Sequence, residues 1–235
     1  MTPLKITWLG HGTFQLELGQ GETVIVDPWI EGNPSYPSSH ALVRLDVMLI
    51  THGHFDHIND AVALGKKFRP QAVGIYELCH WLESQGVENT SPMNKGGTQQ
   101  AGSLQVTMTH ADHSCGILDG GRIVYGGEAC GYVVELPDRR RLYHAGDTNV
   151  FSDMQLIREL YQPELAILPI GDLFTMGPRE AALACRLLRP KKVIPMHFGT
   201  FPPLTGRPEH LRDLLKDQPE TEVVVLQPGQ SLVWV

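Results

Sequence analysis

The sequence has little of what membrane, secreted or disulfide-stabilised proteins need. No apolar run reaches the ~18–20 residues of a membrane-spanning helix. The N-terminal segment, MTPLKITWLG, has no signal-peptide pattern and reads directly as a strand. The four cysteines are scattered without a Cys-x-x-Cys pair, so we expect reduced thiols packed in the core rather than disulfides or a zinc ribbon. These absences predict a soluble, cytoplasmic protein.

Basic residues are also in the minority. The chain has 19 Lys and Arg against 26 Asp and Glu, which gives a formal net charge of −7 over 235 residues. Sequence-independent binding to nucleic acid depends on contacts between basic side chains and phosphates, so a nucleic-acid partner is not expected. A content of 42% hydrophobic and 19% charged residues excludes a largely disordered chain.

Strand and helix patterns alternate along the chain in two similar blocks. Strands are expected at 4–9, 14–18, 23–26, 46–51, 71–75, 104–109, 122–125, 132–136, 141–143, 165–170, 193–196, 222–226 and 231–235. Helices are expected at 59–68, 77–85, 152–161, 178–189 and 208–217. Residues 30–40 predict a loop, and residues 86–102 predict a loop or edge hairpin. The pattern indicates one domain of two αβ halves, about 1–125 and 126–235, with two sheets face to face and helices outside.

Eleven histidines stand out against this ordinary composition. Of these, His52, His54 and His57 lie within six residues at the end of a predicted strand, together with Asp56. Side chains two apart on an extended backbone point to the same side, so His52 and His54 can face one ion. The following turn can aim Asp56 and His57 beside them. Imidazole nitrogens and carboxylate oxygens suit Zn²⁺ and other first-row divalent ions, so the segment predicts a metal site.

Three further predicted strands end in residues of the same kind. His113, Asp147 and His197 each follow a strand, and ligand sites in αβ folds gather at the carboxyl ends of strands. His113 is preferred to His110 because it lies in the loop beyond the strand. Asp147 is preferred to Asp153 because Asp153 falls in the first turn of a predicted helix, where an acid complements the helix dipole.

In this order the motifs resemble the signature of the metallo-β-lactamase fold superfamily, which is His-x-His-x-Asp-His followed by a lone His, a lone Asp and a lone His. The resemblance covers nearly the whole chain. The segments WLGHGTF, VDPW, HAGDT, LPIGD-x-FTM and PMHFGTFP are similar to those of metal-dependent hydrolases akin to L-ascorbate-6-phosphate lactonase-like proteins. The fold that this resemblance implies is a four-layer αββα sandwich, of the α/β (α+β) class.

The resemblance also implies a centre with two divalent metal ions. The implied ligands are His52, His54 and His113 for one ion, Asp56, His57 and His197 for the other, and Asp147 as the bridge. A hydroxide activated by the two ions would attack a lactone, ester or phosphodiester bond of a small molecule. Asp56 and Asp147 are the carboxylates expected to act in catalysis. Zinc is the favoured metal, and manganese, nickel and iron suit the same ligands.

Several other residues near these motifs are candidates to support the ligands or to touch the substrate. They are His11, Asp27, His144, Phe174, Met176, Thr200 and Phe201. An ordinary role in a turn or in the core stays open for each of them. For His11 the two interpretations balance. For His144 a place in the core or beside the ligands is favoured over a role as a ligand. Core packing is slightly favoured for Phe174, Met176, Thr200 and Phe201.

Other functions of the same fold also stay open. One is a non-catalytic metal-binding or regulatory module, but such a protein would lack a ligand, and this chain has all seven. Another is a nucleic-acid phosphodiesterase, which would carry additional modules for which 235 residues leave little room. Oxygen-reducing di-iron members have a glutamate where this chain has His54. We therefore expect a hydrolase with a small-molecule substrate and no membrane partner, and homo-oligomer formation is left open.

Overall fold

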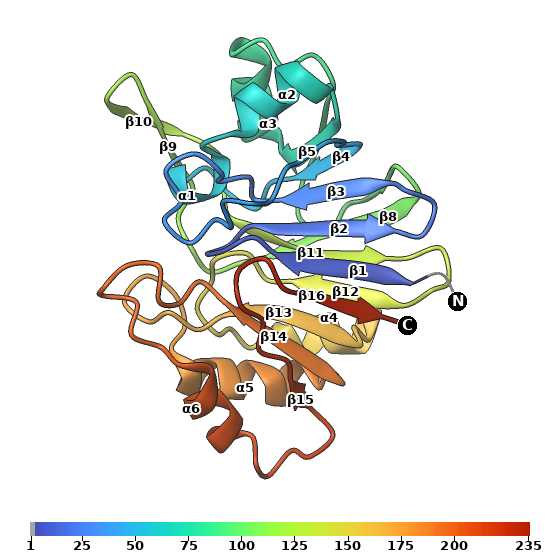
Figure 1. The fold of residues 1–235 in the computed structure, drawn as a ribbon, viewed down its shortest axis with the longest axis vertical. Coiled ribbons are helices and arrows are strands. Elements are labelled where there is room, and N and C mark those ends of the chain that lie inside the picture. Colours follow the sequence, from blue (N-terminus) through green and yellow to red (C-terminus); the bar gives the residue numbers. More distant parts are fainter. Residues whose placement is uncertain (1–2) are drawn as a thin grey trace.

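Alternating apolar positions along short strands build two sheets that pack face to face (Figure 1). The computed structural model describes residues 3–235, and each sheet in that range has seven strands. The first sheet contains β1 (Leu4–Trp8), β2 (Phe14–Leu18), β3 (Thr23–Val26), β4 (Val47–Leu49), β5 (Gln71–Ile75), β6 (Thr90–Met93) and β16 (Ser231–Trp234). The second sheet contains β7 (Thr98–Ala101), β8 (Leu104–His110), β11 (Cys130–Glu135), β12 (Arg141–His144), β13 (Leu165–Pro169), β14 (Lys192–Met196) and β15 (Glu222–Val223).

Helices form the outer layers of the sandwich. They are α1 (Phe55–Ile58), α2 (Ala61–Phe68), α3 (Tyr76–Ser84), α4 (Met154–Tyr161), α5 (Pro178–Leu188) and α6 (Pro208–Leu214). In Figure 1, α2 and α3 lie at one end of the long axis and α5 and α6 at the other, with the strands between them. The predicted αββα sandwich is confirmed. Across residues 3–235, none of the helices has the length and apolar character needed to span a bilayer.

Each sheet has a parallel part, and this orients the loops that matter for function. β3, β4 and β5 run parallel in the first sheet, and β12, β13 and β14 run parallel in the second. The predicted strand–helix–strand unit over 165–196 is confirmed as β13–α5–β14. Pro178 occupies the first turn of α5, where its missing N–H costs no helical hydrogen bond. Successive parallel strands therefore end at the same edge of their sheet.

Large apolar side chains fill the space between the sheets. Phe14 and Ile25 of the first sheet and Tyr132 of the second are completely buried in one cluster. The Tyr132 hydroxyl donates a 2.7 Å hydrogen bond to the carbonyl of Ile50, just after β4, so a polar contact also joins the two sheets. A second cluster, which includes Tyr143, packs the second sheet against α4 and α5. Full burial of one such side chain stabilises the fold by about 1.5–3 kcal/mol.

The division between the sheets does not follow the predicted boundary near residue 125. β7 and β8 precede that residue but belong to the second sheet, and β16 from the C-terminal end pairs with β1 in the first. The segment predicted as a loop or edge hairpin at 86–102 instead holds the edge strand of each sheet, β6 and β7. Pro92 is tolerated in β6 because an edge strand does not need every N–H.

A short hairpin stands apart from both sheets. It consists of β9 (Gly116–Asp119) and β10 (Arg122–Tyr125), and it projects from the body on the side of α1 (Figure 1). The sequence pattern predicts β10 but not β9. The signal was present in the Gly120-Gly121 pair, whose φ angles of +53° and +79° suit the two-residue turn that joins antiparallel strands.

Candidate metal centre

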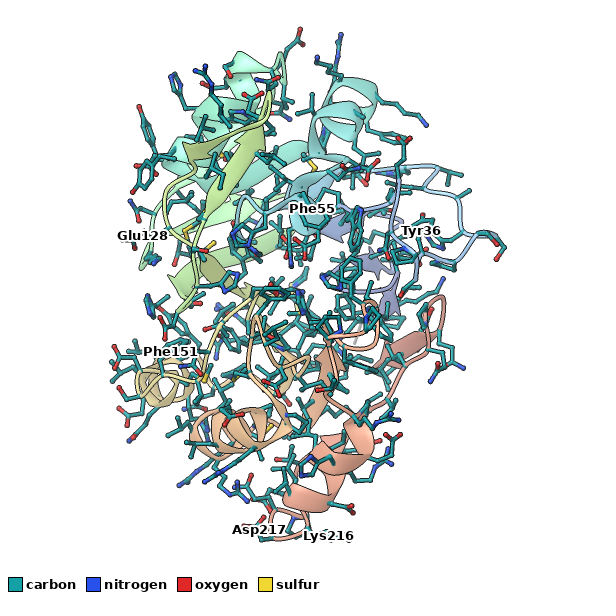
Figure 2. The ribbon with its side chains drawn as sticks, turned by 90° about the vertical axis from the view of Figure 1, so that its left-hand side faces the viewer. Tyr36, Phe55, Glu128, Phe151, Lys216 and Asp217 are labelled. Carbon is teal, nitrogen blue, oxygen red and sulfur yellow. The ribbon has the colours of Figure 1, made fainter. Side chains whose placement is uncertain are left out.

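Loops from both sheets meet on one side of the molecule, which Figure 2 shows with Phe55 near its middle. β1, β3 and β4 run in one direction in the first sheet, and β8, β12 and β14 run in a common direction in the second. The loops after these strands carry the predicted ligands. The structure brings all seven of them together in two adjoining clusters, with Asp147 between.

Three imidazoles converge in the first group, which we call the three-imidazole cluster: His52, His54 and His113. His52 Nε2 lies 3.0 Å from His54 Nδ1, and His113 Nε2 lies 3.2 Å from the same atom. Ligand nitrogens on one tetrahedral Zn²⁺ lie about 3.3–3.4 Å apart, given Zn–N distances of ~2.0–2.1 Å. These two separations are within a few tenths of an ångström of that value, and one ligand nitrogen of each of the three rings lies within 4.8 Å of the others.

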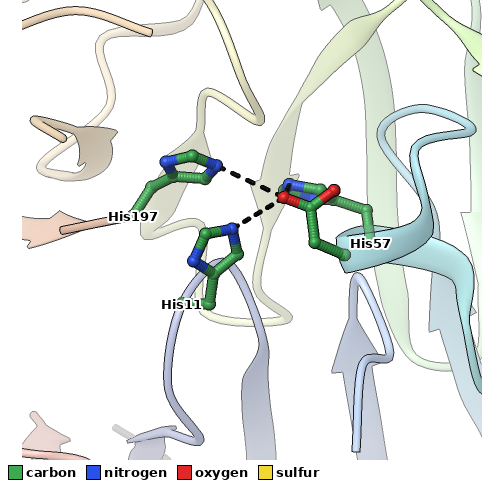
Figure 3. Close-up of side chains that lie close together, drawn as sticks. His11, His57 and His197 are labelled. Atoms are coloured by element: carbon green, nitrogen blue, oxygen red, sulfur yellow. Dashed lines mark hydrogen bonds and ion pairs between the residues drawn. The ribbon is translucent and has the colours of Figure 1, made fainter. Parts of the chain in front are cut away.

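The second group, which we call the mixed cluster, combines Asp56, His57 and His197, with His11 at its edge. Figure 3 shows the rings of His11, His57 and His197 converging from different parts of the chain. His197 Nε2 lies 3.7 Å from Asp56 Oδ2. Helix formation begins at Phe55 rather than at the predicted residue 59, so Asp56 and His57 project from the single turn of α1.

One carboxylate oxygen lies within reach of both clusters. Oδ2 of Asp147 is 3.0 Å from His197 Nε2 and 3.3 Å from His57 Nε2 in the mixed cluster. The same atom is 3.8 Å from His113 Nε2 and 3.9 Å from His52 Nε2 in the three-imidazole cluster. The alternative acid, Asp153, is the N-cap residue of α4, which begins at Met154 and not at the predicted residue 152.

Several buried polar atoms here lack a hydrogen-bond partner within residues 3–235. They are His57 Nε2, both ring nitrogens of His197, and Asp147 Oδ1. A buried, unsatisfied polar group costs about 1–3 kcal/mol, so several in one place indicate a missing bound group. Imidazole nitrogens and carboxylate oxygens together are the donors that first-row divalent ions prefer. The residues present therefore fit metal ions.

Asp27 orients His57 from behind. The backbone N–H and the hydroxyl of Thr51 each donate a 2.7 Å hydrogen bond to the Asp27 carboxylate. Asp27 Oδ2 lies 2.8 Å from His57 Nδ1, so that nitrogen donates to the carboxylate and Nε2 faces the cluster. The sequence left open whether Asp27 merely closes a turn, and the structure places it against a predicted ligand.

His11 contacts Asp56 in a similar way. Its Nε2 lies 2.8 Å from Asp56 Oδ2, and its Nδ1 lies 2.9 Å from the hydroxyl of Thr200. The backbone of His11 has a φ of +54°, and its carbonyl accepts a 2.9 Å hydrogen bond from Trp8 Nε1. Burial lowers the pKa of His11 to about 4 despite the opposing effect of Asp56, so the ring is neutral at physiological pH.

The three-imidazole cluster is electrically neutral at physiological pH without a metal. Burial is the main cause that lowers the pKa of His52, and nearby His57 lowers it further. Burial also lowers the pKa of His54 and His113. Three unprotonated imidazoles with free lone pairs are the form in which histidine binds metals.

The mixed cluster is charged. Burial by itself would lower the pKa of His197, but Asp147 outweighs it and raises the pKa to about 9. Burial likewise opposes protonation of His57, yet Asp147 and Asp27 hold its pKa well above the usual value. Burial would raise the pKa of Asp147, but His197 and His57 keep it well below the ordinary range. The carboxylates are therefore ionised at neutral pH and available to a cation.

Some candidates belong neither to the two clusters nor to the lining of the cavity above them. His144 is fully buried, its Nδ1 accepts from the Gly146 N–H at 3.2 Å, and burial lowers its pKa to about 4. Met176 is packed in the core beneath α5. His110 is exposed at the end of β8 beside Phe151, so the preference for His113 agrees with the geometry.

Cys115, which the sequence assigned only to core packing, and Ile117, for which it indicated no role, pack against the loop that carries His52 and His54. The Gly53 N–H donates to Cys115 Sγ at 3.2 Å, and that thiol donates to the Gly126 carbonyl at 3.1 Å. A Cβ at Gly53 would lie 2.5 Å from Cγ1 of Ile117, so only glycine fits between His52 and His54. All four thiols are free and buried, as expected. No local sequence signal would have paired Cys115 with a residue 62 positions away.

A cavity of about 380 Å³ opens over the two clusters. Its floor contains side chains of the centre: His11, His54, Asp56, His113, Asp147 and His197. Its walls are largely apolar: Phe55, Leu118, Ile123, Phe174, Phe201 and Leu204. Phe174 and Phe201 line the cavity, which is one of the two roles that the sequence left open for them. Phe55, Leu118 and Ile123 are additional lining residues that sequence patterns did not indicate.

Comparison with known proteins agrees with this geometry. Residues 22–198 match a family model described as a beta-lactamase superfamily domain. The UPF0173 metal-dependent hydrolase of Solibacter usitatus is 64% identical over 98% of this chain and 100% of its own length. That of Methanopyrus kandleri is 47% identical over 97% of this chain and 99% of its own. The solved structure of Igni18, a metallo hydrolase from Ignicoccus hospitalis, superposes with a TM-score of 0.87 and 33% identity over 99% of both chains.

These similarities define an enzyme, a metal-dependent hydrolase with the metallo-β-lactamase fold. The chain belongs to the metallo-β-lactamase superfamily and, within it, to the family of UPF0173 metal-dependent hydrolases. The family expected from the order of the histidine and aspartate motifs is confirmed.

Proposed function

We propose that this protein hydrolyses a lactone, ester or phosphodiester bond of a small molecule at a centre with two metal ions. The observation that supports this proposal most strongly is the position of Asp147. A single oxygen of its carboxylate lies within 4 Å of imidazole nitrogens from both clusters. Two ions in hydrolytic sites stand ~3.5–4 Å apart, and a shared carboxylate offsets their mutual repulsion.

The proposed ligand sets follow the two clusters. His52, His54 and His113 would hold one ion, Asp56, His57 and His197 the other, and Asp147 both. When bound, such ions lower the pKa of water towards ~7 and polarise the carbonyl or phosphoryl oxygen under attack. This chemistry requires no serine or cysteine nucleophile, which agrees with the absence of an exposed cysteine within residues 3–235.

The remaining residues would act by orientation. Asp27 keeps the proton of His57 on Nδ1 and so directs Nε2 inward. His11 would position Asp56 through its 2.8 Å contact, and Thr200 would fix the ring of His11 from the other side. Asp56 and Asp147, both ionised, would supply the negative charge that balances the ions during the reaction.

The metal and its amount are testable directly. We expect about two divalent ions per chain, with zinc favoured over manganese, nickel and iron for this set of imidazole and carboxylate ligands. Elemental analysis of protein purified without added metal measures both quantities. A content near one ion per chain, unchanged by added metal, would contradict the dinuclear proposal.

Hydrolysis itself is tested with bis(p-nitrophenyl) phosphate, p-nitrophenyl acetate and a simple lactone, using metal-loaded protein. We expect turnover of at least one of them, and a loss of at least about a hundredfold in Asp147→Ala, because stabilisation by the ions amounts to several kcal/mol. Asp46→Ala is the matched control, since Asp46 is partly exposed and pairs with Arg44 away from the cavity. Equal rates in Asp147→Ala and in the unchanged protein would sink the proposal.

A further inference from the structure

The walls of the cavity above the metal ligands are apolar but stay open to solvent. Phe55 is 53% exposed, Leu118 61%, Ile123 81% and Phe174 62%. Isolated exposed apolar side chains are common on protein surfaces, but a contiguous apolar group around a concave site marks a binding surface. These four residues line the same cavity as the predicted metal ligands.

The hairpin β9–β10 is built to present two of these side chains. Ile117 pairs with Val124, and both point to the side that packs on the body, where Ile117 fills the space beside Gly53. Leu118 pairs with Ile123 on the opposite face, because successive strand residues alternate between faces. The face that would ordinarily be polar therefore carries apolar side chains and borders the cavity.

The cavity also has few positive side chains: His197, whose pKa is raised to about 9, is already paired with Asp147. Within residues 3–235, its lining includes neither Lys nor Arg. Nearby Lys95 is engaged by Glu128, with 2.7 Å between Nζ and Oε2. A substrate with a second anionic group would bury that charge against apolar side chains without a partner, which is costly.

We propose that Phe55, Leu118, Ile123 and Phe174 form a subsite for the apolar acyl group of an uncharged carboxylic ester or lactone. This inference rests on the proposed function and narrows its substrate class. Hydrolysis would add one water across the acyl carbon–oxygen bond, releasing a carboxylic acid and an alcohol, or one hydroxy acid from a lactone. The ligands of the centre would lie at the carbonyl, and the hairpin would cover the chain beyond it.

The first test is a series of p-nitrophenyl esters from acetate to octanoate, with bis(p-nitrophenyl) phosphate as the charged comparison. Rates with Asp147→Ala are subtracted as background. Complete burial of one methylene would raise kcat/KM up to about fourfold, so we expect hexanoate to exceed acetate by at least about tenfold. We also expect the esters to be hydrolysed faster than the phosphodiester. A flat ester series, or a preference for the phosphodiester, would overturn the inference and leave the hydrolase proposal intact.

A double variant tests the hairpin itself. In Leu118→Ser/Ile123→Ser, the preference for hexanoate over acetate should fall at least about fivefold. Leu160→Ser on α4 is the matched control, because Leu160 is 70% exposed and is not part of the cavity lining. The control should keep the chain-length preference of the unchanged protein. An unchanged preference in the double variant would remove the hairpin from the subsite.

A binding experiment tests the apolar subsite independently of turnover. The probes are 2-butanone, 2-hexanone and 2-octanone, which resemble esters but are not hydrolysed, and saturation-transfer NMR reports their affinity for the metal-loaded protein. We expect affinity to rise with chain length and to fall in Leu118→Ser/Ile123→Ser. If this holds while neither an ester, a lactone nor the phosphodiester is cleaved, the subsite stands and the proposed hydrolysis fails. If affinity does not depend on chain length, the subsite is refuted even when esters are cleaved.

Discussion

The three-imidazole cluster and the mixed cluster lie side by side but differ in charge. His52, His54 and His113 are neutral, because burial lowers the pKa of each ring. Asp147 is therefore the carboxylate that would balance the charge of an ion held there. The mixed cluster instead contains its own carboxylate, Asp56, and has a second one, Asp27, directly behind His57.

This difference arises within one short segment, from His52 to His57, which contributes side chains to both clusters. His52 and His54 project from the extended backbone before α1, whereas Asp56 and His57 project from the helical turn itself. Four residues within six positions are thus divided between two sites by a single change of backbone conformation. The charged half of the segment needs surrounding polar groups, and Asp27 and His11 provide them.

The largest effect should come from removing one ligand from either cluster. We expect His113→Ala and His57→Ala each to lower turnover by at least about a hundredfold, because both ions take part in the proposed reaction. Elemental analysis should show that each variant keeps about one ion per chain, held by the other cluster. Loss of both ions in either variant, with circular dichroism unchanged, would mean that the clusters do not bind independently.

Asp27→Asn tests the support that only the mixed cluster has. The amide cannot accept a charge-assisted bond from His57 Nδ1, and loss of such an orienting partner typically weakens metal binding 10–100-fold. Competition with a chelator should release one ion per chain earlier and leave the other unaffected. Asp46→Asn is the matched control. Equal weakening of both ions would show that Asp27 serves the whole centre.

A smaller effect is expected at His144, the buried histidine outside both clusters. Its pKa of about 4 lies below the ordinary 6.5, so the folded state resists a proton that the unfolded state accepts. The contribution of neutral His144 to the free energy of unfolding is therefore fully present above pH 6.5 and is lost as the pH falls towards 4. The loss amounts to roughly 3 kcal/mol, at about 1.4 kcal/mol per pKa unit.

The measurement is the melting temperature of chelator-treated protein between pH 7 and pH 4.5. His144→Leu should lose several degrees less than the unchanged protein over this range, whatever its stability at pH 7. Identical pH dependence in the two proteins would show that His144 does not titrate with a lowered pKa in the core.

The smallest effect is expected at His110, which the sequence offered as an alternative to His113. His110 is exposed beside Phe151, and its Nδ1 lies 3.4 Å from Lys95 Nζ. We expect His110→Ala to keep the metal content and to change kcat/KM less than about twofold, as surface substitutions usually do. A loss comparable with that of His113→Ala would reassign the third imidazole.

Much of the fold and the centre could be predicted from the sequence because the relevant signals are local. Strand alternation and turn residues located most strands but not β6, β7 and β9, and the segment from His52 to His57 indicated a metal site by its spacing and its place at a strand end. His113, Asp147 and His197 were each predicted from their place after a strand. The hairpin strand β9 was overlooked although its Gly-Gly turn was a usable signal.

Contacts between distant segments could not be predicted in this way. The bond between Asp27 and His57 spans 30 positions, and that between Gly53 and Cys115 spans 62. Neither residue type indicates which residue it contacts, because aspartate commonly closes turns and a buried cysteine commonly packs as a small apolar group. The same holds for β7, β8 and β16, whose sheet membership depends on which edges were free to pair.

The sequence by itself determined the types of the proposed ligands and the elements that carry them, because these follow from side-chain chemistry and from periodicity along the chain, and their order indicated the family. Only the tertiary structure decided that the carboxyl ends of strands from two separate sheets meet at one edge. It also decided that one Asp147 oxygen lies near both clusters and that Leu118 and Ile123 face the cavity. The physical reason is that these relations are set by packing between surfaces. Such packing depends on the shapes of all the elements together, not on any one segment.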